Sequence, residues 1–335
     1  MTPFALKMGQ ACSAMWLAAA CLLAPAPAAA ADAAPEPVLA VLAKVQQAAR
    51  QLDYSGVYTY HQGQVMSSSR IVHMVDGTGE RERIEILDGA PREFIRQNDV
   101  TQCLFPEKKT VVIERRNGER FPSLLLGSGK DLPAHYEMRP QAAVGRVAGR
   151  ECAILELVPR DGLRYGYRLC VDTKTGLLLK LQTLSAERDV LDQIAFNSIQ
   201  VGDKIESSLL ASNWNLKDWK VVEPSMSPID LAKNGWRIPF PQGFQPITQV
   251  QRHMKRGAVS QLVVTDGLAA ISVFIEPFEQ DQKGQHANAV VSAGAMNIFR
   301  TRVGDHWLTA LGEVPPETLR GIAERTEYVP LAQPQ

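Results

Sequence analysis

The sequence predicts an α+β fold that is mostly antiparallel β: a large sheet with one helix packed on it, and a smaller β-rich second domain that ends in a helix. Three observations predict this fold. Short β-rich runs separated by glycine-containing turns fill most of the chain, and strands joined by such short turns must be antiparallel. One amphipathic helical pattern precedes these runs and another follows them. A polar, proline-bearing stretch divides a long array of strands from a short one.

The first 31 residues have the pattern of a secretory signal peptide. Lys7 precedes an apolar run over residues 11–24, and four alanines at 28–31 follow it. A charged start, an apolar middle and a small-residue end are typical of a cleaved leader. A run of about 14 residues is also short for a bilayer span. We therefore expect residues 1–31 to be removed and the mature protein to be exported.

Charge and composition exclude some classes of partner. The chain has 36 Lys and Arg residues against 36 Asp and Glu residues, a net charge of zero. It therefore lacks an excess of positive charge that would attract nucleic acid, and we expect no nucleic-acid partner. A hydrophobic content of 45% is that of a globular chain, and what remains after the leader is enough for two domains.

The first domain is predicted to cover residues 32–209. Apolar residues at helical spacing predict a helix over 36–52. After it, the pattern changes to strands bounded by turn residues. The predicted strands are 56–62, 69–75, 81–87, 93–97, 100–105, 110–115, 145–149, 152–158, 164–171, 177–184 and 192–201.

Several of these strands are apolar on both faces, as in 177–184. A sheet with one wet face would alternate more cleanly. One interpretation is a sheet covered on both sides by helix and loops. The other is a curved, unclosed barrel whose apolar concave face could hold an acyl chain. The sequence does not choose between them.

Residues 210–227 are predicted to be a linker, because they are polar and break the β-rich pattern, with Pro224 inside them and Pro228 directly after them. Trp214 and Trp219 are its candidate packing residues, expected to lie between the domains. The second domain is predicted over 228–333. Its expected strands are 247–254, 260–267, 269–278, 297–304 and 305–314, followed by a helix over 315–328.

Three cysteines remain after the leader. If the turn after Val158 is centred on Asp161, Cys152 and Cys170 face each other directly. Opposed residues have Cβ atoms about 4.5–5.5 Å apart, close enough for a disulfide after modest adjustment. The alternative is two thiols that behave as small apolar side chains. Cys103 is then the odd cysteine, expected to be buried in a strand.

No catalytic signature is found in the sequence. It lacks a nucleophile-elbow motif and a phosphate-binding loop, and its six histidines do not have metal-site spacing. We therefore expect no enzyme, no cofactor and no metal. His61 and His73 could approach across a hairpin, although surface positions are the commoner outcome. The alternating charges at 80–83 predict a solvated strand face with cross-strand ion pairs.

Two local basic groups are candidates for contacts with a phosphate or an acidic peptide, because the planar guanidinium matches such anions. The alternative is ordinary solubilising charge. The first group is Lys108, Lys109, Arg115, Arg116 and Arg120, and the second is Arg252, Lys255, Arg256, Arg300 and Arg302.

Four stretches resemble the MucB/RseB family, in order along nearly the whole mature chain. They are VPRDGLRYGYR (158–168), DTKTGLLLKL (172–181), LVVTDGLAAISVFIEP (262–277) and the end of the chain from GAMNIFRTRVGDHW (294–307). The leading pieces YSGVYTY (54–60) and EILDGAPREFIR (85–96) resemble the family as well. We take Arg164, Tyr165 and Tyr167, within the first stretch, as further candidate contacts with a partner or anion. They join Arg252, Arg256, Arg300 and Arg302.

The resemblance implies a half-open β-barrel of LolA-like type as the lipid-sensing first domain, and an anti-sigma-binding second domain. It implies a periplasmic regulator of an envelope-stress sigma factor, which binds the periplasmic domain of a membrane-anchored anti-sigma factor. That binding shields the partner from site-1 proteolysis until lipopolysaccharide or another lipid releases it. A periplasmic lipid or lipoprotein carrier, and a hydrolase with a dispersed triad, are the alternatives. Exposed strand edges would also allow a homo-oligomer.

Overall fold

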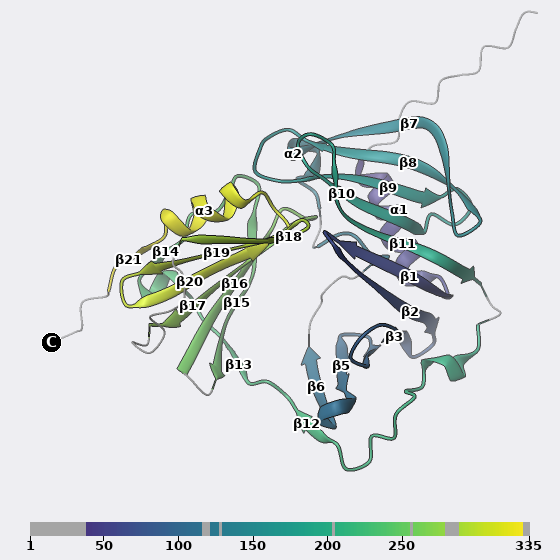
Figure 1. Cartoon of the computed structure of the whole chain (residues 1–335), viewed down its shortest axis with the longest axis horizontal. Helices are drawn as coiled ribbons and strands as arrows, with labels where there is room; N and C mark the ends of the chain where they lie inside the picture. Colours follow the sequence, from purple (N-terminus) through teal and green to yellow (C-terminus); the bar gives the residue numbers. More distant parts are fainter. Residues whose placement is uncertain are drawn as a thin grey trace, which may run out of the picture. The chain divides into compact units, whose positions relative to one another are not determined.

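The computed structural model describes residues 38–115, 121–126, 129–202, 205–254, 257–278 and 288–330. The predicted leader and four predicted basic residues, Arg116, Arg120, Lys255 and Arg256, lie outside these ranges. Strands dominate the described residues and form sheets of twelve, seven and two strands (Figure 1). None of the helices in the described ranges is long and apolar enough to cross a membrane.

The twelve-stranded sheet has the order β12-β6-β5-β4-β3-β2-β1-β11-β10-β9-β8-β7. All neighbours are antiparallel except β12 and β6. The order has two ends, so the sheet does not close on itself, and the predicted open and mostly antiparallel fold is confirmed. Its strands are β1 (Tyr54–Gln62), β2 (Val65–Asp76), β3 (Gly79–Ile86), β4 (Arg92–Gln97), β5 (Val100–Phe105), β6 (Thr110–Arg115), β7 (Tyr136–Val147), β8 (Arg150–Pro159), β9 (Gly166–Asp172), β10 (Leu178–Leu184), β11 (Val190–Val201) and β12 (Lys220–Val222).

The predicted first helix is α1 (Val38–Gln51). Its Leu42 and Val45 are fully buried against the sheet. The hydroxyl of Tyr54, at the start of β1, donates a hydrogen bond to the carbonyl of Ala49 at 3.0 Å. Side chains two apart on a strand share a face, so α1 covers the face of β1 that carries Tyr54 and leaves the far end of that face to other contacts.

The predicted strand at 145–149 is wrong in extent, because β7 begins nine residues earlier, at Tyr136. The register shifts between Pro140 and Val144, and most of β7 is exposed. An exposed edge strand with a bulge has neither the apolar alternation nor the regular spacing that marks a strand in sequence. The one-turn helix α2 (Leu132–His135), which precedes β7, was not predicted either.

The hairpin of β8 and β9 corrects the predicted cysteine register. Cys152 faces Asp172, and Cys170 faces Ile154, so the expected direct opposition of the two cysteines is wrong by two residues. They are instead diagonal neighbours with Cα atoms 5.3 Å apart, and the structure joins their Sγ atoms in a disulfide. Cys103 is buried in β5, outside this disulfide.

The seven-stranded sheet has the order β13-β15-β16-β17-β20-β19-β18. The helix α3 (Pro316–Glu324) packs across β19 and β20 (Figure 1) and buries Leu319 and Ile322. It is shorter than predicted, because the chain then forms β21 (Glu327–Tyr328), which pairs with β14 (Trp236–Arg237). The strands of the larger of these two sheets are β13 (Met226–Pro228), β15 (Gln245–Met254), β16 (Gly257–Thr265), β17 (Ala270–Pro277), β18 (Ala289–Ala293), β19 (Met296–Val303) and β20 (His306–Gly312).

The predicted linker contributes a strand to each large sheet. β12 pairs in parallel with β6, and β13 pairs with β15. Trp214 and Trp219 lie close to each other, with ring centroids 6.4 Å apart, and Trp214 is 39% exposed. Their predicted packing between the domains stays a prediction.

Candidate functional site

A cavity of about 460 Å³ lies over the middle strands of the twelve-stranded sheet. Tyr54, Tyr58 and Tyr60 alternate along β1 and share a face, of which α1 covers the Tyr54 end. The face is therefore partly covered by helix and partly hollowed, which combines the two interpretations of the sequence. The cavity is lined by Tyr58, Tyr60, Ser67, Ser69, Ile86, Phe121, Leu181, Thr183, Asp192, Gln193, Ile194 and Glu313.

The strand register orders this lining from an apolar end to a polar end. At the apolar end, Tyr58 is opposite Ser69, and Ser69 is opposite Ile86. The ring of Phe121 lies 5.5 Å from that of Tyr58. At the polar end, Thr183 is opposite Asp192.

Asp192 connects the two large sheets. Its carboxylate accepts hydrogen bonds from the Tyr60 hydroxyl at 3.2 Å and from the backbone N–H of Gly63 at 3.3 Å. It also accepts one from the backbone N–H of Ala295, in the turn between β18 and β19. Gly294, in the same turn, has a φ of +58°, and a Cβ there would collide with the Asp192 carboxylate. The turn reaches Asp192 because this position has no side chain.

Glu313 completes the polar end from the second sheet, where it follows β20. Among the described residues, no hydrogen bond or ion pair engages its carboxylate. Burial and the nearby charge of Asp192 raise the pKa of Glu313. Burial also raises the pKa of Asp192, although the hydrogen bonds from Ala295, Tyr60 and Gly63 oppose it. Burial is the largest cause of both raised pKa values, and among the described residues neither carboxylate forms an ion pair.

A second junction between the sheets is built on Arg164, in the loop between β8 and β9. Its guanidinium is fully buried and donates to Asp266 at 2.9 Å and to Asp161 at 3.0 Å. It also donates to the backbone carbonyl of Gln242. The Tyr136 hydroxyl donates to the same Asp266 oxygen at 2.9 Å. The anionic partners of Arg164 are therefore carboxylates of this chain.

The neighbours of Arg164 extend this junction. The side-chain amide of Asn297 donates to the Tyr165 hydroxyl at 3.0 Å, and the Thr318 hydroxyl donates to the carbonyl of Leu163 at 2.9 Å. Tyr167 is 3% exposed and belongs to the core of the first sheet. That these residues contact a partner stays a prediction, and it would require the junction to open.

The predicted basic residues of the second sheet are held by aromatic and acidic neighbours. Arg300 pairs with Glu276 at 2.7 Å and lies 4.4 Å above the Trp307 ring. Arg302 lies 4.1 Å above the Phe278 ring. Arg252 is half-buried in β15, and Arg256 is outside the described residues. The structure thus brings Arg300 and Arg302 to one strand, β19, apart from Arg164.

Two of the four alternating charges on β3 are buried and the other two, Glu80 and Arg81, are partly exposed, so the predicted solvated face is wrong. Glu82 and Arg83 are 6% and 4% exposed. The predicted cross-strand ion pairs are present: Arg83 contacts Glu93 at 2.8 Å, and Arg96 contacts both Glu80 and Glu82. The segment after β11 covers one face here, because Arg83 donates to the carbonyl of Leu209.

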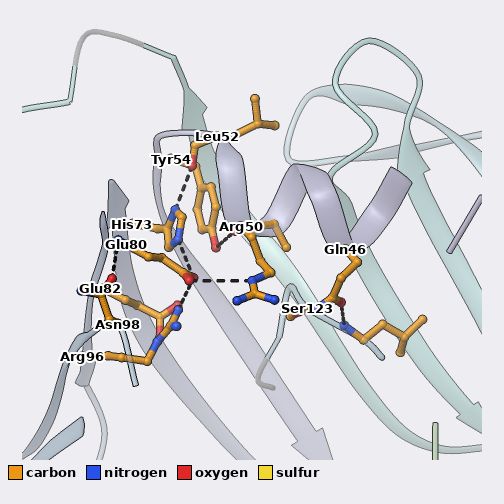
Figure 2. Close-up of polar contacts among 12 residues, drawn as sticks. Gln46, Arg50, Leu52, Tyr54, His73, Glu80, Glu82, Arg96, Asn98 and Ser123 are labelled. Carbon is orange, nitrogen blue, oxygen red and sulfur yellow. Dashed lines mark hydrogen bonds and ion pairs between the residues drawn. The ribbon is translucent and has the colours of Figure 1, made fainter. Parts of the chain in front are cut away.

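His73 belongs to this network and does not approach His61. His61 is opposite Met66, whereas His73 is opposite Tyr54 and stacks on its ring at 4.7 Å. The His73 nitrogens contact the Leu52 carbonyl at 2.8 Å and Glu80 at 3.0 Å (Figure 2). In the described ranges no three acidic, histidine or cysteine side chains group as metal ligands would.

Sequence reasoning missed Asp192, Glu313 and Asp266. Asp266 lay at the end of the predicted strand 260–267, but nothing local marks it as the partner of Arg164. Asp192 and Glu313 belong to different sheets, and only the folded chain brings them to one cavity. The position of this carboxylate at the start of the predicted strand 192–201 was the one available signal for Asp192.

Two family models match most of the chain. The MucB/RseB N-terminal domain matches residues 37–214, and the MucB/RseB C-terminal domain matches residues 230–327. The sigma factor AlgU regulatory protein MucB of Pseudomonas aeruginosa is 30% identical over 293 residues, which cover 84% of this chain and 88% of that protein. The sigma-E factor regulatory protein RseB of Escherichia coli is 27% identical over 308 residues, which cover 86% and 90%.

Solved structures agree with this similarity. The crystal structure of MucB in complex with MucA(peri) matches with a TM-score of 0.68 and 28% identity, over 86% of this chain and 98% of that chain. The crystal structure of MucB matches with a TM-score of 0.61 and 27% identity, over 87% and 97%.

Proposed function

This chain belongs to the MucB/RseB family, and we propose that it is a periplasmic negative regulator of an envelope-stress sigma factor. It binds the periplasmic domain of a membrane-anchored anti-sigma factor and shields that domain from site-1 proteolysis. Binding of lipopolysaccharide or another lipid releases the partner. The protein acts by binding and not by catalysis.

One observation carries the proposal. A relative that is 28% identical, and of which this chain covers 98%, is solved in complex with MucA(peri). Relatives named as regulators of sigma factors match over most of this chain. Both the sheet that carries the cavity and the sheet that supplies Glu313 are therefore shared with proteins of that role.

The arrangement of the two sheets supports a release mechanism. The cavity is lined mainly by the first sheet, but Glu313 comes from the second. A ligand that enters it contacts both sheets and favours one relative arrangement over another. If the anti-sigma domain prefers a different arrangement, each ligand weakens the binding of the other. A tenfold displacement needs only about 1.4 kcal/mol of coupling.

A protection assay tests the proposal. The candidate anti-sigma periplasmic domain is incubated with its site-1 protease, alone and with this protein. We expect slower cleavage in the presence of the protein, and recovery of cleavage when lipopolysaccharide is added. Cleavage at the same rate with and without the protein would contradict the proposal.

The cavity favours a second candidate function, a periplasmic carrier of lipids or lipoproteins. A volume of about 460 Å³ lies in the range of small-molecule sites, about 300–1,000 Å³. Co-purification with the anti-sigma domain separates the two functions, because a carrier alone has no reason to retain it.

A further inference from the structure

The polar end of the cavity has an unusual charge balance. Two of its lining residues, Asp192 and Glu313, are carboxylates, and the described residues of the lining include no Lys, Arg or His. The remaining polar lining is neutral: the hydroxyls of Tyr58, Tyr60, Ser67, Ser69 and Thr183, and the amide of Gln193. His61 is the basic group whose charge acts on Asp192, and its side chain is exposed outside the cavity lining.

Of the two carboxylates in the cavity lining, Glu313 is the one without a hydrogen-bond partner among the described residues. Its carboxylate is mostly buried and, among the described residues, engages no donor, whereas Asp192 already accepts hydrogen bonds from Tyr60, Gly63 and Ala295. A buried carboxylate without a partner is unfavourable, and a donor or cation relieves the cost. A phosphate or carboxylate in the same place would add a further negative charge at low dielectric.

The opposite end of the cavity is suited to an acyl chain. Ile86 and Phe121 line it, and Leu181 and Ile194 continue the apolar surface towards Asp192. The rings of Phe121 and Phe196 are 5.0 Å apart, which closes this end with aromatic surface. An extended molecule with an apolar tail and a polar tip therefore matches the order of the lining.

We propose that the cavity binds an amphiphile whose polar tip is a hydrogen-bond donor, an ammonium or a hydroxyl group, and that Glu313 and Asp192 reject anionic tips. This inference rests on the proposed function, because it describes the lipid that releases the partner. A phosphate-bearing lipid then binds only with its phosphates outside the cavity. Because Glu313 follows a strand of the second sheet and Asp192 belongs to the first, a polar tip held by both carboxylates contacts both sheets at once.

Head-group preference in the unmodified chain is the primary test. The chain without its leader is titrated by calorimetry with three probes that share a twelve-carbon tail: dodecylammonium, a monolauroyl glycerol and dodecyl phosphate, each kept below micelle formation. At neutral pH and physiological salt, we expect the ammonium and glycerol probes to bind at least about tenfold more tightly than the phosphate. Equal or tighter binding of dodecyl phosphate overturns the inference.

Variants assign the preference to named residues. In Glu313→Gln the amide oxygen still accepts a hydrogen bond, so we expect the glycerol probe to keep its affinity and the ammonium probe to lose about tenfold. Asp192→Asn is the second variant, with a smaller loss expected because its carboxylate is already hydrogen-bonded. Glu187→Gln, at an exposed position outside the cavity lining, is the matched control and should change nothing.

The remaining outcomes are also decisive. If Glu313→Gln weakens all three probes by the same factor, the residue does not select the head group and the inference fails. If no probe binds while the protein still protects the anti-sigma domain, the inference fails and the binding role in the proposed function stands. If a probe binds in the expected order but the protein does not protect that domain, the inference holds and the proposed function fails.

Discussion

Two groups of carboxylates in this molecule are buried to a similar degree but behave in opposite ways. Burial alone would raise the pKa of Glu80, but hydrogen bonds from His73 and Arg96 outweigh it and hold the pKa at about 2. At the cavity, burial raises the pKa of Glu313, and the charge of Asp192 adds to the effect. The difference is the presence of a cation within hydrogen-bonding distance.

The comparison separates a structural role from a binding role. The carboxylates near His73 are all paired within the chain (Figure 2), and such paired carboxylates help to make the structure rigid. Glu313 still has an open acceptor that faces a cavity. The first group holds the sheet together, whereas the second is available to a ligand.

The largest expected effect comes from removal of the cation in the paired group. Arg96→Met removes the guanidinium that pairs with both Glu80 and Glu82 and leaves Glu80 only the longer contact with Arg50 at 3.8 Å and its contact with His73. We expect a loss of about 3 kcal/mol in the free energy of unfolding. Chemical denaturation of the two proteins measures it. Arg115→Met is the matched control, since its ion pair with Glu223 is exposed and should be worth at most about 0.5 kcal/mol. Equal losses in the two variants would remove the distinction.

A smaller loss of unfolding free energy is expected when a neutral hydrogen-bond donor to the buried carboxylate of Glu93 is removed. The Ser212 hydroxyl donates to Glu93 at 2.7 Å, and Glu93 is 1% exposed. Ser212→Ala removes this hydrogen bond to a buried carboxylate but leaves the contact with Arg83, so the expected loss is about 1.5 kcal/mol. The same denaturation experiment measures it, and a loss as large as that of Arg96→Met would show that the hydroxyl is as important as the guanidinium.

Neutralising the unpaired carboxylate of Glu313 is expected to raise the free energy of unfolding, whereas the two substitutions above lower it. Glu313→Gln replaces a buried carboxylate that lacks a partner with a neutral group of the same shape. We expect the free energy of unfolding to rise by about 1 kcal/mol at neutral pH. A loss of stability, measured by denaturation without added ligand, would mean that the carboxylate already has a stabilising partner.

The smallest expected effect is on the pH dependence of the free energy of unfolding, and its sign differs between Glu313 and Glu80. Because the folded-state pKa of Glu313 is raised above its ordinary value of 4.5, its unfavourable contribution is relieved as the pH falls through the raised value. Because that of Glu80 is lowered to about 2, its stabilising contribution is lost as the pH falls from 4.5 towards 2.

Thermal unfolding over a range of pH measures both signs. The advantage of Glu313→Gln over the unmodified chain should shrink as the pH falls from neutral towards 4.5. The deficit of Glu80→Gln should persist over that range and shrink only at lower pH. Parallel curves for the unmodified chain and Glu313→Gln would contradict the raised pKa.

The sequence predicted the features that depend on local pattern. The strands from β1 to β6 are bounded by turn residues, and α1 has helical apolar spacing, so both were found close to their observed bounds. β12 and β13 were missed because their pairing is decided by distant residues. The first nine residues of β7 were missed because this edge strand is mostly exposed to solvent. β18 was also missed, since a run of five small and apolar residues has no local boundary that marks it as a strand.

The candidate site was less predictable than the fold for the same reason. Asp192 and Glu313 are far apart in sequence and have ordinary neighbours, so only the docking of the two sheets makes them a pair. Arg83 looked like a surface charge because alternation does not reveal that the segment around Leu209 and Ser212 covers its face. Glu82 lies on the opposite face, where it is buried beside Arg96.

The short connection between β12 and β13 has a mechanical consequence. Only residues 223–225 separate a strand of one sheet from a strand of the other, and four Cα steps of about 3.8 Å span at most about 15 Å. With the junctions at Arg164 and Asp192 broken, the sheets can rotate about this point but cannot drift apart. Such a short connection keeps each sheet at an effective concentration of about millimolar relative to the other. The broken contacts therefore re-form readily, and closure needs little intrinsic affinity between the two halves.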